Sequence, residues 1–315
     1  MRVSALIPTY NRLSHLPHAI DSILAQTLPV DEIVVLDDGS TDDTASAIRE
    51  RYGARVRVVR QANAGVARAR QRAIEEAHGE WVAFLDSDDL WRPTKLERQF
   101  QALTALGDNF GVCFTNCAYT GNPGLHLSPF DEAGLDGTAP FGPLQDTVKF
   151  VLGKFTPIYI QSLLARRALL FEAGGFDEAL KVAEDTDILF RLTFKTSFCF
   201  VAEQLVEIDR TPSRSDGLMD SFQKMDDRTY VCMQHMLSKW LALPELTDPG
   251  TRAQIREHLR LLNYGWAVGR FSQMQLKRAL QNIHDLRALG DDYGTIFGTF
   301  AARAAGKLNR KLRRG

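Results

Sequence analysis

The two carboxylates of Asp86-Ser87-Asp88 are the feature of this sequence with the clearest chemistry. They follow residues 81–85, an apolar run typical of a buried strand. Residues two apart in an extended chain point to the same side, so both carboxylates would enter one site. Such hard oxygen ligands suit Mg²⁺ or Mn²⁺, which bind through one or two carboxylates plus ligand phosphates. The pattern predicts a divalent-cation site at Asp86 and Asp88; the alternative is a solvated acidic turn.

Polar residues also follow two earlier apolar runs. Thr9-Tyr10 comes after residues 3–7, and Asp37-Asp38 comes after residues 33–36. Asp38 is suited to accept a hydrogen bond from a nucleobase N–H or a ribose hydroxyl, and Tyr10 offers an aromatic face to a base. Taken singly, each segment is equally typical of ordinary turn chemistry. Together they follow strands at their carboxyl ends, where open α/β sheets bind ligands.

Two predicted helices carry charged residues near their first turns. Arg68, Arg70 and Arg72 lie near the start of a helix that begins around residue 66. A helix N-terminus does not favour a cation, so Arg70 needs an anionic partner, either a nucleotide phosphate or the Asp86 cluster. A solvated basic face is the alternative. Glu184-Asp185 opens a later helix, whose dipole favours acidic residues there for structural reasons alone and also suits a carboxylate that accepts a hydroxyl proton.

These residues require a scaffold, and the patterning predicts one. Short apolar runs alternate with helical patterns from the N-terminus to about residue 114, which predicts a doubly covered, mostly parallel α/β sheet. Residues 121–142 are rich in Gly, Pro and Asp and are predicted to form a long loop near the site. After Thr211 strand signals disappear. We therefore expect a domain over residues 1–215 and a helical C-terminal region over residues 216–315.

The end of the chain has a basic amphipathic pattern. Its apolar positions fall on one helical face, with most of the cations elsewhere: Phe297, Phe300, Ala304, Leu308 and Leu312. This pattern fits a helix resting on an anionic membrane surface, and it equally fits a terminal helix docked on the protein.

Composition excludes several classes of protein. The 315 residues carry a net charge of −1, so no global basic field favours nucleic acid as a partner. Hydrophobic residues at 44% provide a real core, and no apolar run approaches the roughly 20 residues of a membrane-spanning helix. The four cysteines are predicted to be buried, reduced thiols. We expect a cytoplasmic protein, with peripheral binding to the inner face of the cell membrane if the basic tail binds lipid.

In their order and spacing, the motifs resemble the family 2 glycosyltransferases, inverting nucleotide-sugar enzymes of the GT-A fold. The resemblance covers about residues 1–210. The matching segments are Pro8-Thr9-Tyr10-Asn11, Ile23-Leu24-Ala25-Gln26-Thr27, Asp37-Asp38-Gly39-Ser40-Thr41-Asp42, Asn63-Ala64-Gly65, Ala69-Arg70, Phe84-Leu85-Asp86-Ser87-Asp88-Asp89, Gly174-Gly175-Phe176-Asp177 and Glu184-Asp185.

The resemblance implies a role for each matching position. The nucleotide would be held by Thr9, Tyr10, Asp38, Arg70 and Asp86. Mn²⁺ or Mg²⁺ would bind at Asp86 and Asp88, with Asp88 the direct ligand. Asp185 would be the general base, supported by Glu184. The implied partners are a nucleotide-diphosphate sugar donor and a glycan or lipid-linked acceptor.

The chain departs from the family pattern at one place. Many relatives carry Arg-x-His after the strand that follows the base helix, whereas this chain reads Asp209-Arg210-Thr211-Pro212 and has no histidine there. Arg210 and Arg214 are then candidates for a diphosphate contact.

Other classes of protein fit less well. A nucleotidyltransferase would show a Gly- and Lys-rich loop after the first strand, and a Rossmann oxidoreductase would show G-x-G-x-x-G there. Neither pattern is present. A non-catalytic nucleotide-sugar-binding scaffold remains as the alternative from another class, and the presence of Asp88 and Asp185 argues against it.

Overall fold

The structure is a computed structural model that describes residues 1–135, 137–153, 155–211, 226–272, 275–296 and 298–299. The chain divides into two compact units, residues 1–220 and 221–315, each of which is described by itself. The predicted boundary at residues 215–216 lies outside the described residues. So do Arg214 and the predicted apolar face of the basic tail.

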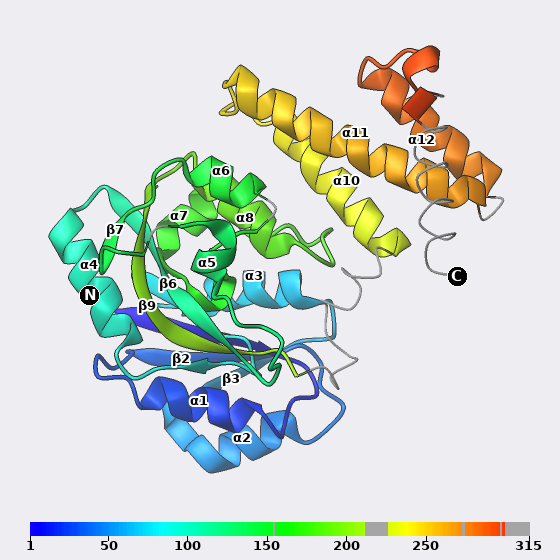
Figure 1. The fold of residues 1–315 in the computed structure, drawn as a ribbon. Helices are drawn as coiled ribbons and strands as arrows, with labels where there is room; N and C mark the ends of the chain where they lie inside the picture. Colours follow the sequence, from blue (N-terminus) through cyan, green and yellow to red (C-terminus); the bar gives the residue numbers. More distant parts are fainter. Residues whose placement is uncertain (136, 154, 212–225, 273–274, 297, 300–315) are drawn as a thin grey trace. The chain divides into compact units, whose positions relative to one another are not determined.

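The first unit is built on one curled, mostly parallel sheet (Figure 1). Its order is β3-β2-β1-β4-β8-β6-β9-β5, with β7 paired to β9. The long pairings β3-β2-β1-β4 and β6-β9 are parallel, whereas β8 is antiparallel to both β4 and β6. The strands are β1 Val3–Thr9, β2 Glu32–Asp37, β3 Arg57–Arg60, β4 Trp81–Phe84, β5 Leu90–Trp91, β6 Phe110–Thr120, β7 Phe141–Pro143, β8 Leu164–Arg166 and β9 Ser197–Asp209.

Helices cover both faces of this sheet, as the sequence predicts. Side chains of α1, α2 and α4, among them Ile20, Ile48 and Leu96, share one buried cluster with alternate residues of β1. The other face packs on α3 and on the segment around α7 and α8, where the Phe84 and Phe176 rings meet edge to face. The helices are α1 Leu16–Leu24, α2 Thr44–Tyr52, α3 Val66–Glu76, α4 Lys95–Leu106, α5 Pro129–Ala133, α6 Thr147–Leu152, α7 Arg167–Glu172 and α8 Glu184–Leu192, with 3-10 turns at Gly53–Arg55 and Ile160–Ser162.

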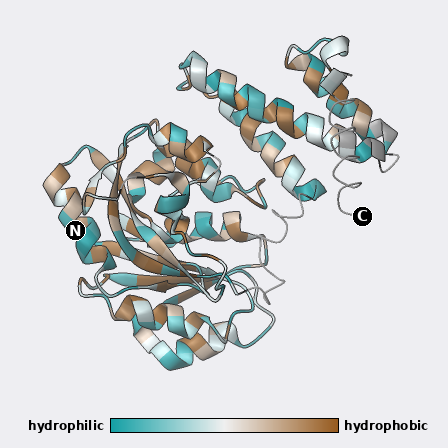
Figure 2. Ribbon diagram, in the orientation of Figure 1, coloured by the Kyte–Doolittle hydropathy of each residue, from teal (hydrophilic) through white to brown (hydrophobic). Residues whose placement is uncertain are grey.

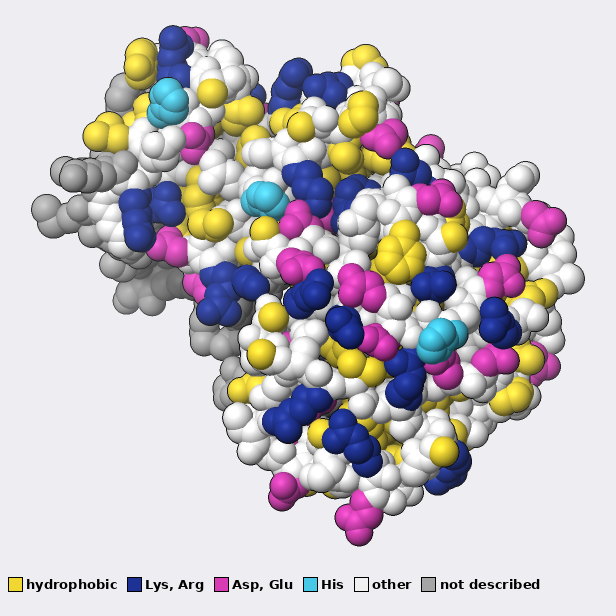
Figure 3. Space-filling view, turned by 180° about the vertical axis from the view of Figure 1, so that it is seen from behind, with side chains coloured by type: hydrophobic (Ala, Val, Ile, Leu, Met, Phe, Trp, Pro, Cys, Tyr) yellow, Lys and Arg dark blue, Asp and Glu magenta, His cyan; other side chains and the backbone are white. Residues whose placement is uncertain are grey.

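Hydropathy follows this layering. In Figure 2 the central strands are largely hydrophobic, while the outer helices alternate between hydrophobic and hydrophilic positions. On the face shown in Figure 3, basic and acidic side chains are interspersed. Cys113, Cys117 and Cys199 are buried thiols, as expected.

The prediction of a long loop or insertion over residues 121–142 is wrong in part, because the segment contains a short helix and the start of a strand. Ser128 and Asp131 form a reciprocal capping box that starts α5, and the Phe141–Pro143 segment pairs with β9 as strand β7. Both elements depend on the surrounding fold. The helix has five residues, and the strand exists only because an edge is available beside it.

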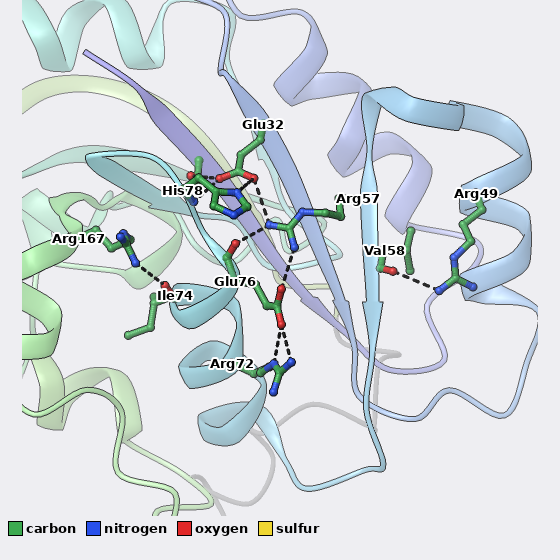
Figure 4. A network of polar contacts seen from close by, with 10 residues as sticks. Glu32, Arg49, Arg57, Val58, Arg72, Ile74, Glu76, His78 and Arg167 are labelled. Atoms are coloured by element: carbon green, nitrogen blue, oxygen red, sulfur yellow. Dashed lines mark hydrogen bonds and ion pairs between the residues drawn. The ribbon is translucent and has the colours of Figure 1, made fainter.

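A network of charged residues, the amino-edge cluster, fixes the C-terminal end of α3 to the starts of the first strands (Figure 4). It consists of Glu32, Arg57, Arg72, Glu76 and His78. Glu32 accepts hydrogen bonds from Ser4, Arg57 and the His78 backbone, and Arg57 also pairs with Glu76 at 2.9 Å. Although burial opposes ionisation, the hydrogen bonds from Ser4, His78 and Arg57 lower the pKa of Glu32 to about 2.

The second unit is helical, as predicted for this part of the chain. Its main helices are α10 Asp227–Leu241, α11 Pro249–Ser272 and α12 Leu276–Ala288, and α11 packs against both of the others. A buried polar network links the three, in which Asn282 donates to Tyr230 Oη and to Asn263 at 2.9 Å. No helix among the described residues combines the length and the apolar character needed to span a bilayer.

Candidate active site

The carboxyl ends of β1 and β2 bring Thr9 and Asp38 together. The Asp38 backbone N–H donates to the Thr9 carbonyl at 2.9 Å. The Asp38 carboxylate accepts from Gln61 Nε2 at 2.7 Å and from the backbone N–H groups of Ala64 and Gly65 at 2.9 and 2.8 Å. Asp38 therefore uses both oxygens to shape the loop that leads into α3. This loop needs Gly65, whose φ is +96°.

Thr9 and Tyr10 differ in exposure at this edge. Thr9 is 4% exposed, and its Oγ1 makes no hydrogen bond within the described part of the chain. A buried hydroxyl without a partner is costly, so this atom marks a position where a ligand or a water completes the site. Tyr10 is 45% exposed, which leaves its ring accessible to a flat group.

Arg70 connects the end of β4 to the start of α8. Its guanidinium contacts Asp86 Oδ1 at 2.7 Å through Nη2 and Glu184 Oε1 through Nη1. Burial disfavours the charge on Arg70, yet Asp86, Glu184 and Asp185 raise its pKa above the usual value. Of the two partners that the sequence allows for Arg70, the structure shows the acidic cluster. We name Arg70, Asp86, Asp88, Glu184 and Asp185 the carboxyl-edge cluster.

Glu184 is buried beside Arg70. Burial raises its pKa to about 7, with Arg70 acting in the opposite direction and Asp185 adding to the rise. Its position at the first residue of α8 follows from Ala183, which adopts a left-handed conformation with φ of +62° just before the helix. A non-glycine residue in that region is strained, so surrounding contacts must hold the turn in place.

Asp185 is half-buried at the second position of α8. Its Oδ1 accepts from the Thr186 backbone N–H at 2.7 Å and from Thr186 Oγ1 at 3.3 Å. Within the described residues Oδ2 has no hydrogen-bond partner. Thr186 thus fixes one carboxylate oxygen of Asp185.

Asp86, Asp88 and Asp89 differ in their surroundings. The Asp86 side chain is 30% exposed and Asp88 is half-buried, whereas Asp89 is buried. Asp89 accepts from Gln161 Nε2 at 2.8 Å and from the Asp209 backbone N–H at 3.1 Å. Burial, followed by the charges of Asp86 and Asp88, raises the pKa of Asp89 well above its usual value. Asp89 is therefore a structural neighbour of the Asp-x-Asp pair.

The donor set at Asp86 and Asp88 fits a hard divalent cation. Among the described residues, no group of three or more His, Cys, Asp or Glu side chains converges as an ion cage. Mg²⁺ and Mn²⁺ do not require such a cage when phosphate oxygens complete the coordination. The expected extended geometry of this segment is wrong, because Ser87 and Asp88 lie in a turn in which the Asp89 backbone N–H donates to the Asp86 carbonyl at 3.2 Å. The alignment of the two carboxylates by strand alternation is therefore lost, and the two-carboxylate cation site stays a prediction.

Several contacts at the site escaped the sequence analysis. Gln71 Oε1 accepts from the Phe176 backbone N–H at 2.9 Å, and Arg68 pairs with Glu178 at 2.6 Å. Gly175 is favoured here because its φ is +69°, and a Cβ would also lie 2.3 Å from Gln71 Oε1 and displace that side chain. These contacts fasten the segment before α8 to α3. Glutamine carries no motif, so only the Gly174-Gly175 pair could have indicated the close approach.

The sequence of this chain matches a known protein family. The sequence model of the family described as glycosyl transferase family 2 matches residues 4–169, more than half of the chain. The chain belongs to glycosyl transferase family 2. The match includes Thr9, Asp38, Arg70, Asp86 and Asp88 and ends before Glu184 and Asp185.

Two relatives named as glycosyltransferases illustrate the extent of the similarity. The putative teichuronic acid biosynthesis glycosyltransferase TuaG of Bacillus subtilis (strain 168) is 37% identical over 134 residues, 42% of this chain and 52% of that protein. An uncharacterized glycosyltransferase of Rickettsia felis is 29% identical over 244 residues, 76% of this chain and 38% of that protein. The chain thus matches about half or less of the length of these relatives.

Solved structures support the GT-A fold. Residues 1–349 of S. aureus TarS in complex with UDP-GlcNAc superpose with a TM-score of 0.69 at 20% identity, covering 92% of this chain and 82% of that one. The mannosyltransferase PcManGT from Pyrobaculum calidifontis, in complex with GDP-Man and Mn²⁺, gives a TM-score of 0.56 at 21% identity, covering 99% and 82%.

Proposed function

We propose that this protein is an inverting glycosyltransferase that moves a sugar from a nucleotide-diphosphate sugar to a hydroxyl of a glycan or lipid-linked acceptor. The observation that carries the proposal is the contact of one buried guanidinium, Arg70, with both Asp86 and Glu184. It joins the predicted cation site to the helix start that carries the predicted base. A donor and an acceptor bound on the two sides of Arg70 would meet at one place.

The donor nucleotide is assigned to the edge formed by β1, β2 and the start of α3. The Thr9 hydroxyl, which has no hydrogen-bond partner among the described residues, and the exposed Tyr10 ring would contact a nucleobase or ribose, and Asp38 holds the surrounding loop. Family membership supports this assignment, as do the donors named with similar structures, UDP-GlcNAc and GDP-Man.

The cation is assigned to Asp86 and Asp88. Mn²⁺ or Mg²⁺ bound there would neutralise the charge of a departing diphosphate. Arg70 contributes a fixed positive charge beside Asp86, and its burial keeps that charge from being screened by water. PcManGT, a similar structure, is described with Mn²⁺.

Asp185 is assigned as the general base. As the acceptor oxygen forms its bond to the anomeric carbon, the bond from that carbon to the diphosphate breaks and the diphosphate leaves with the electron pair. The hydroxyl proton passes to Asp185 Oδ2, the oxygen that Thr186 does not occupy. Attack opposite the leaving group inverts the anomeric configuration and needs no covalent enzyme intermediate.

Calorimetric titration with UDP, GDP, TDP and CDP, each with and without Mn²⁺, tests the proposal. We expect one diphosphate to bind, and to bind more tightly with Mn²⁺. Transfer assays then use sugar donors carrying that nucleotide. Failure of all four to bind would overturn the donor and cation assignments. Metal-dependent binding without transfer to any glycan or lipid-linked acceptor would favour the non-catalytic scaffold.

A further inference from the structure

Arg210 occupies an unusual position at the carboxyl end of β9. Its guanidinium lies over the rings of Tyr119 and Tyr159, with 5.6 and 5.8 Å from the guanidinium carbon to the two ring centres. Within the described residues its side chain makes no hydrogen bond and no ion pair. Stacking on two rings restricts the side chain while leaving its N–H donors unused. Such an arginine is prepared for a planar oxyanion, which it can bind through two parallel hydrogen bonds.

The two tyrosines are themselves held in place. Their hydroxyls lie 2.9 Å apart, and Tyr119 Oη donates to Glu132 at 3.1 Å. Burial, together with Tyr159 and Glu132, raises the pKa of Tyr119, so this ring stays neutral beneath the guanidinium. The nearby acids have other contacts: Glu132 accepts from Tyr119, and Asp209 Oδ1 accepts from the Thr211 N–H and hydroxyl.

Asp89 places this cluster beside the predicted cation site. It is bonded to the Asp209 backbone, which precedes Arg210, and to Gln161, which lies two residues after Tyr159. Because β8 is antiparallel to β4 and to β6, strands β6 and β9 run in the same direction as β4. The ends of β6 and β9 therefore share the edge that carries Asp86.

Strand order separates this cluster from the nucleotide. Thr9 ends β1 and Asp38 follows β2, on one side of β4. Tyr119 lies in β6 and Arg210 follows β9, beyond β8 on the other side. A donor that spans from Thr9 to Asp86 ends at β4. On the proposed function, the β6-β9 side is then left for the acceptor.

We infer that Arg210, supported by Tyr119 and Tyr159, binds an anionic group of the acceptor, a phosphate or carboxylate close to the hydroxyl that receives the sugar. The inference extends the proposed function and rests on it, because only a transferase has an acceptor. It makes Arg210 a specificity determinant that selects charged glycans over neutral ones. Two charge-assisted hydrogen bonds correspond to a preference of about tenfold or more.

The test compares matched ligands that differ only in charge. Methyl glucuronide is paired with methyl glucoside, and glycerol 3-phosphate with glycerol. Binding to the full chain is measured by saturation-transfer NMR, with and without Mn²⁺ and the diphosphate chosen by calorimetry. We expect each anionic ligand to bind about tenfold or more tightly than its neutral partner. Arg210→Gln should remove the preference, and Arg210→Lys should keep part of it.

Arg166→Gln is the matched control. Arg166 also stacks on an aromatic ring, that of Trp81 at 4.7 Å, but it pairs with Glu80 at the opposite edge of the sheet. This variant should keep the preference for anionic ligands. Circular dichroism and thermal melting establish that each variant is folded.

Three results would overturn the inference: equal binding of anionic and neutral ligands, no binding of either anionic ligand, or a preference that survives in folded Arg210→Gln. Diphosphate affinity distinguishes whether the anion bound by Arg210 belongs to the donor or to the acceptor. If Arg210→Gln weakens diphosphate binding as much as it weakens anionic ligands, Arg210 contacts the donor and the inference is wrong. Failure of the wild type to bind any diphosphate is a failure of the proposed function, and the ligand comparison without nucleotide still decides the role of Arg210.

Discussion

Helix α3 is held at its two ends by charged clusters of opposite character. In the amino-edge cluster, Glu32 and Glu76 face Arg57 and Arg72, so acids and bases are matched in number (Figure 4). In the carboxyl-edge cluster, a single arginine, Arg70, meets Asp86 and Glu184, with Asp88 and Asp185 close by in the chain. The first cluster is electrostatically complete. The second has an excess of carboxylates that a protein retains at a cost in stability.

The difference supports a structural role for the amino-edge cluster and the functional role that we propose for the carboxyl-edge cluster. A matched network on a partly exposed surface needs no ligand and contributes modestly to stability. An excess of carboxylates around one buried arginine favours the binding of cations and of groups that donate protons. Both clusters act on the same helix, so substitutions at its two ends can be compared directly.

The largest expected effect is on transfer itself. Asp185→Asn removes the group proposed to accept the hydroxyl proton and should lower kcat by about 10²–10⁴-fold. Diphosphate affinity should stay within about twofold, because Asp185 acts on the acceptor. Steady-state kinetics and calorimetry measure the two quantities. Asp108→Asn, at a fully exposed position, is the control. Equal turnover in Asp185→Asn and the wild type would remove the base assignment.

Substitution of the two arginines measures the difference in stability between the clusters. Arg70→Gln leaves buried Glu184 without its cation and should lower the free energy of unfolding by about 3 kcal/mol. Arg57→Gln, whose side chain is 36% exposed, should cost about 1 kcal/mol or less. Urea denaturation at neutral pH gives both values. Equal losses would show that the two clusters do not differ in the way described.

The amino-edge cluster should also produce a pH dependence. The folded-state pKa of Glu32 is about 2, below its usual 4.5. A lowered pKa stabilises the fold above pH 4.5, and this contribution is lost as the pH falls towards 2. With allowance for solvent, we expect a loss of about 2 kcal/mol. Unfolding free energies of Glu32→Gln should vary less with pH in this window than those of the wild type. An unchanged slope would contradict this.

The smallest effect concerns the cation. Mn²⁺ should tighten binding of the preferred diphosphate by about tenfold in the wild type, because the ion and the phosphates complete each other's coordination. Asp88→Asn should abolish the tightening while leaving metal-free binding in place. Asp108→Asn again serves as control. If Asp88→Asn kept the full Mn²⁺ effect, Asp88 would not be the ligand and the ion would have to be assigned to other residues.

The sequence predicts the parallel part of the fold well because local patterns determine it. Apolar runs such as residues 33–36 and the polar residues after them need no distant partner to be recognised. The three-residue strands β7 and β8 are different. Among the described strands β7 pairs only with β9, and β8 enters antiparallel between β4 and β6, so each depends on strands that are distant in the sequence. No local pattern in a segment of that length specifies its direction.

The site shows the same division. Asp86 and Asp38 follow strands in the sequence, so their convergence at one edge could be predicted. The contact of Arg70 with Glu184 spans 114 residues, and the bond from Asp89 to the Asp209 backbone spans 120. Such contacts arise from the packing of whole elements, and patterns of residue type do not contain them. The positions of Asp86, Asp88 and Asp185 were accessible from motifs, whereas the contacts that hold them were not.

The contact of Arg70 with Asp86 and Glu184 also bears on the order in which substrates bind. A ligand that attracts Asp86 alters how strongly Arg70 neutralises Glu184 and its neighbour Asp185. By thermodynamic reciprocity, whatever binds beside Asp185 must alter affinity at Asp86 by the same factor. We therefore expect binding of the proposed donor and acceptor to be cooperative, positively or negatively, even if the two never touch. The double-reciprocal plots of initial rate, measured while both substrates are varied, would then have lines that intersect away from the horizontal axis, where lines for independent sites meet.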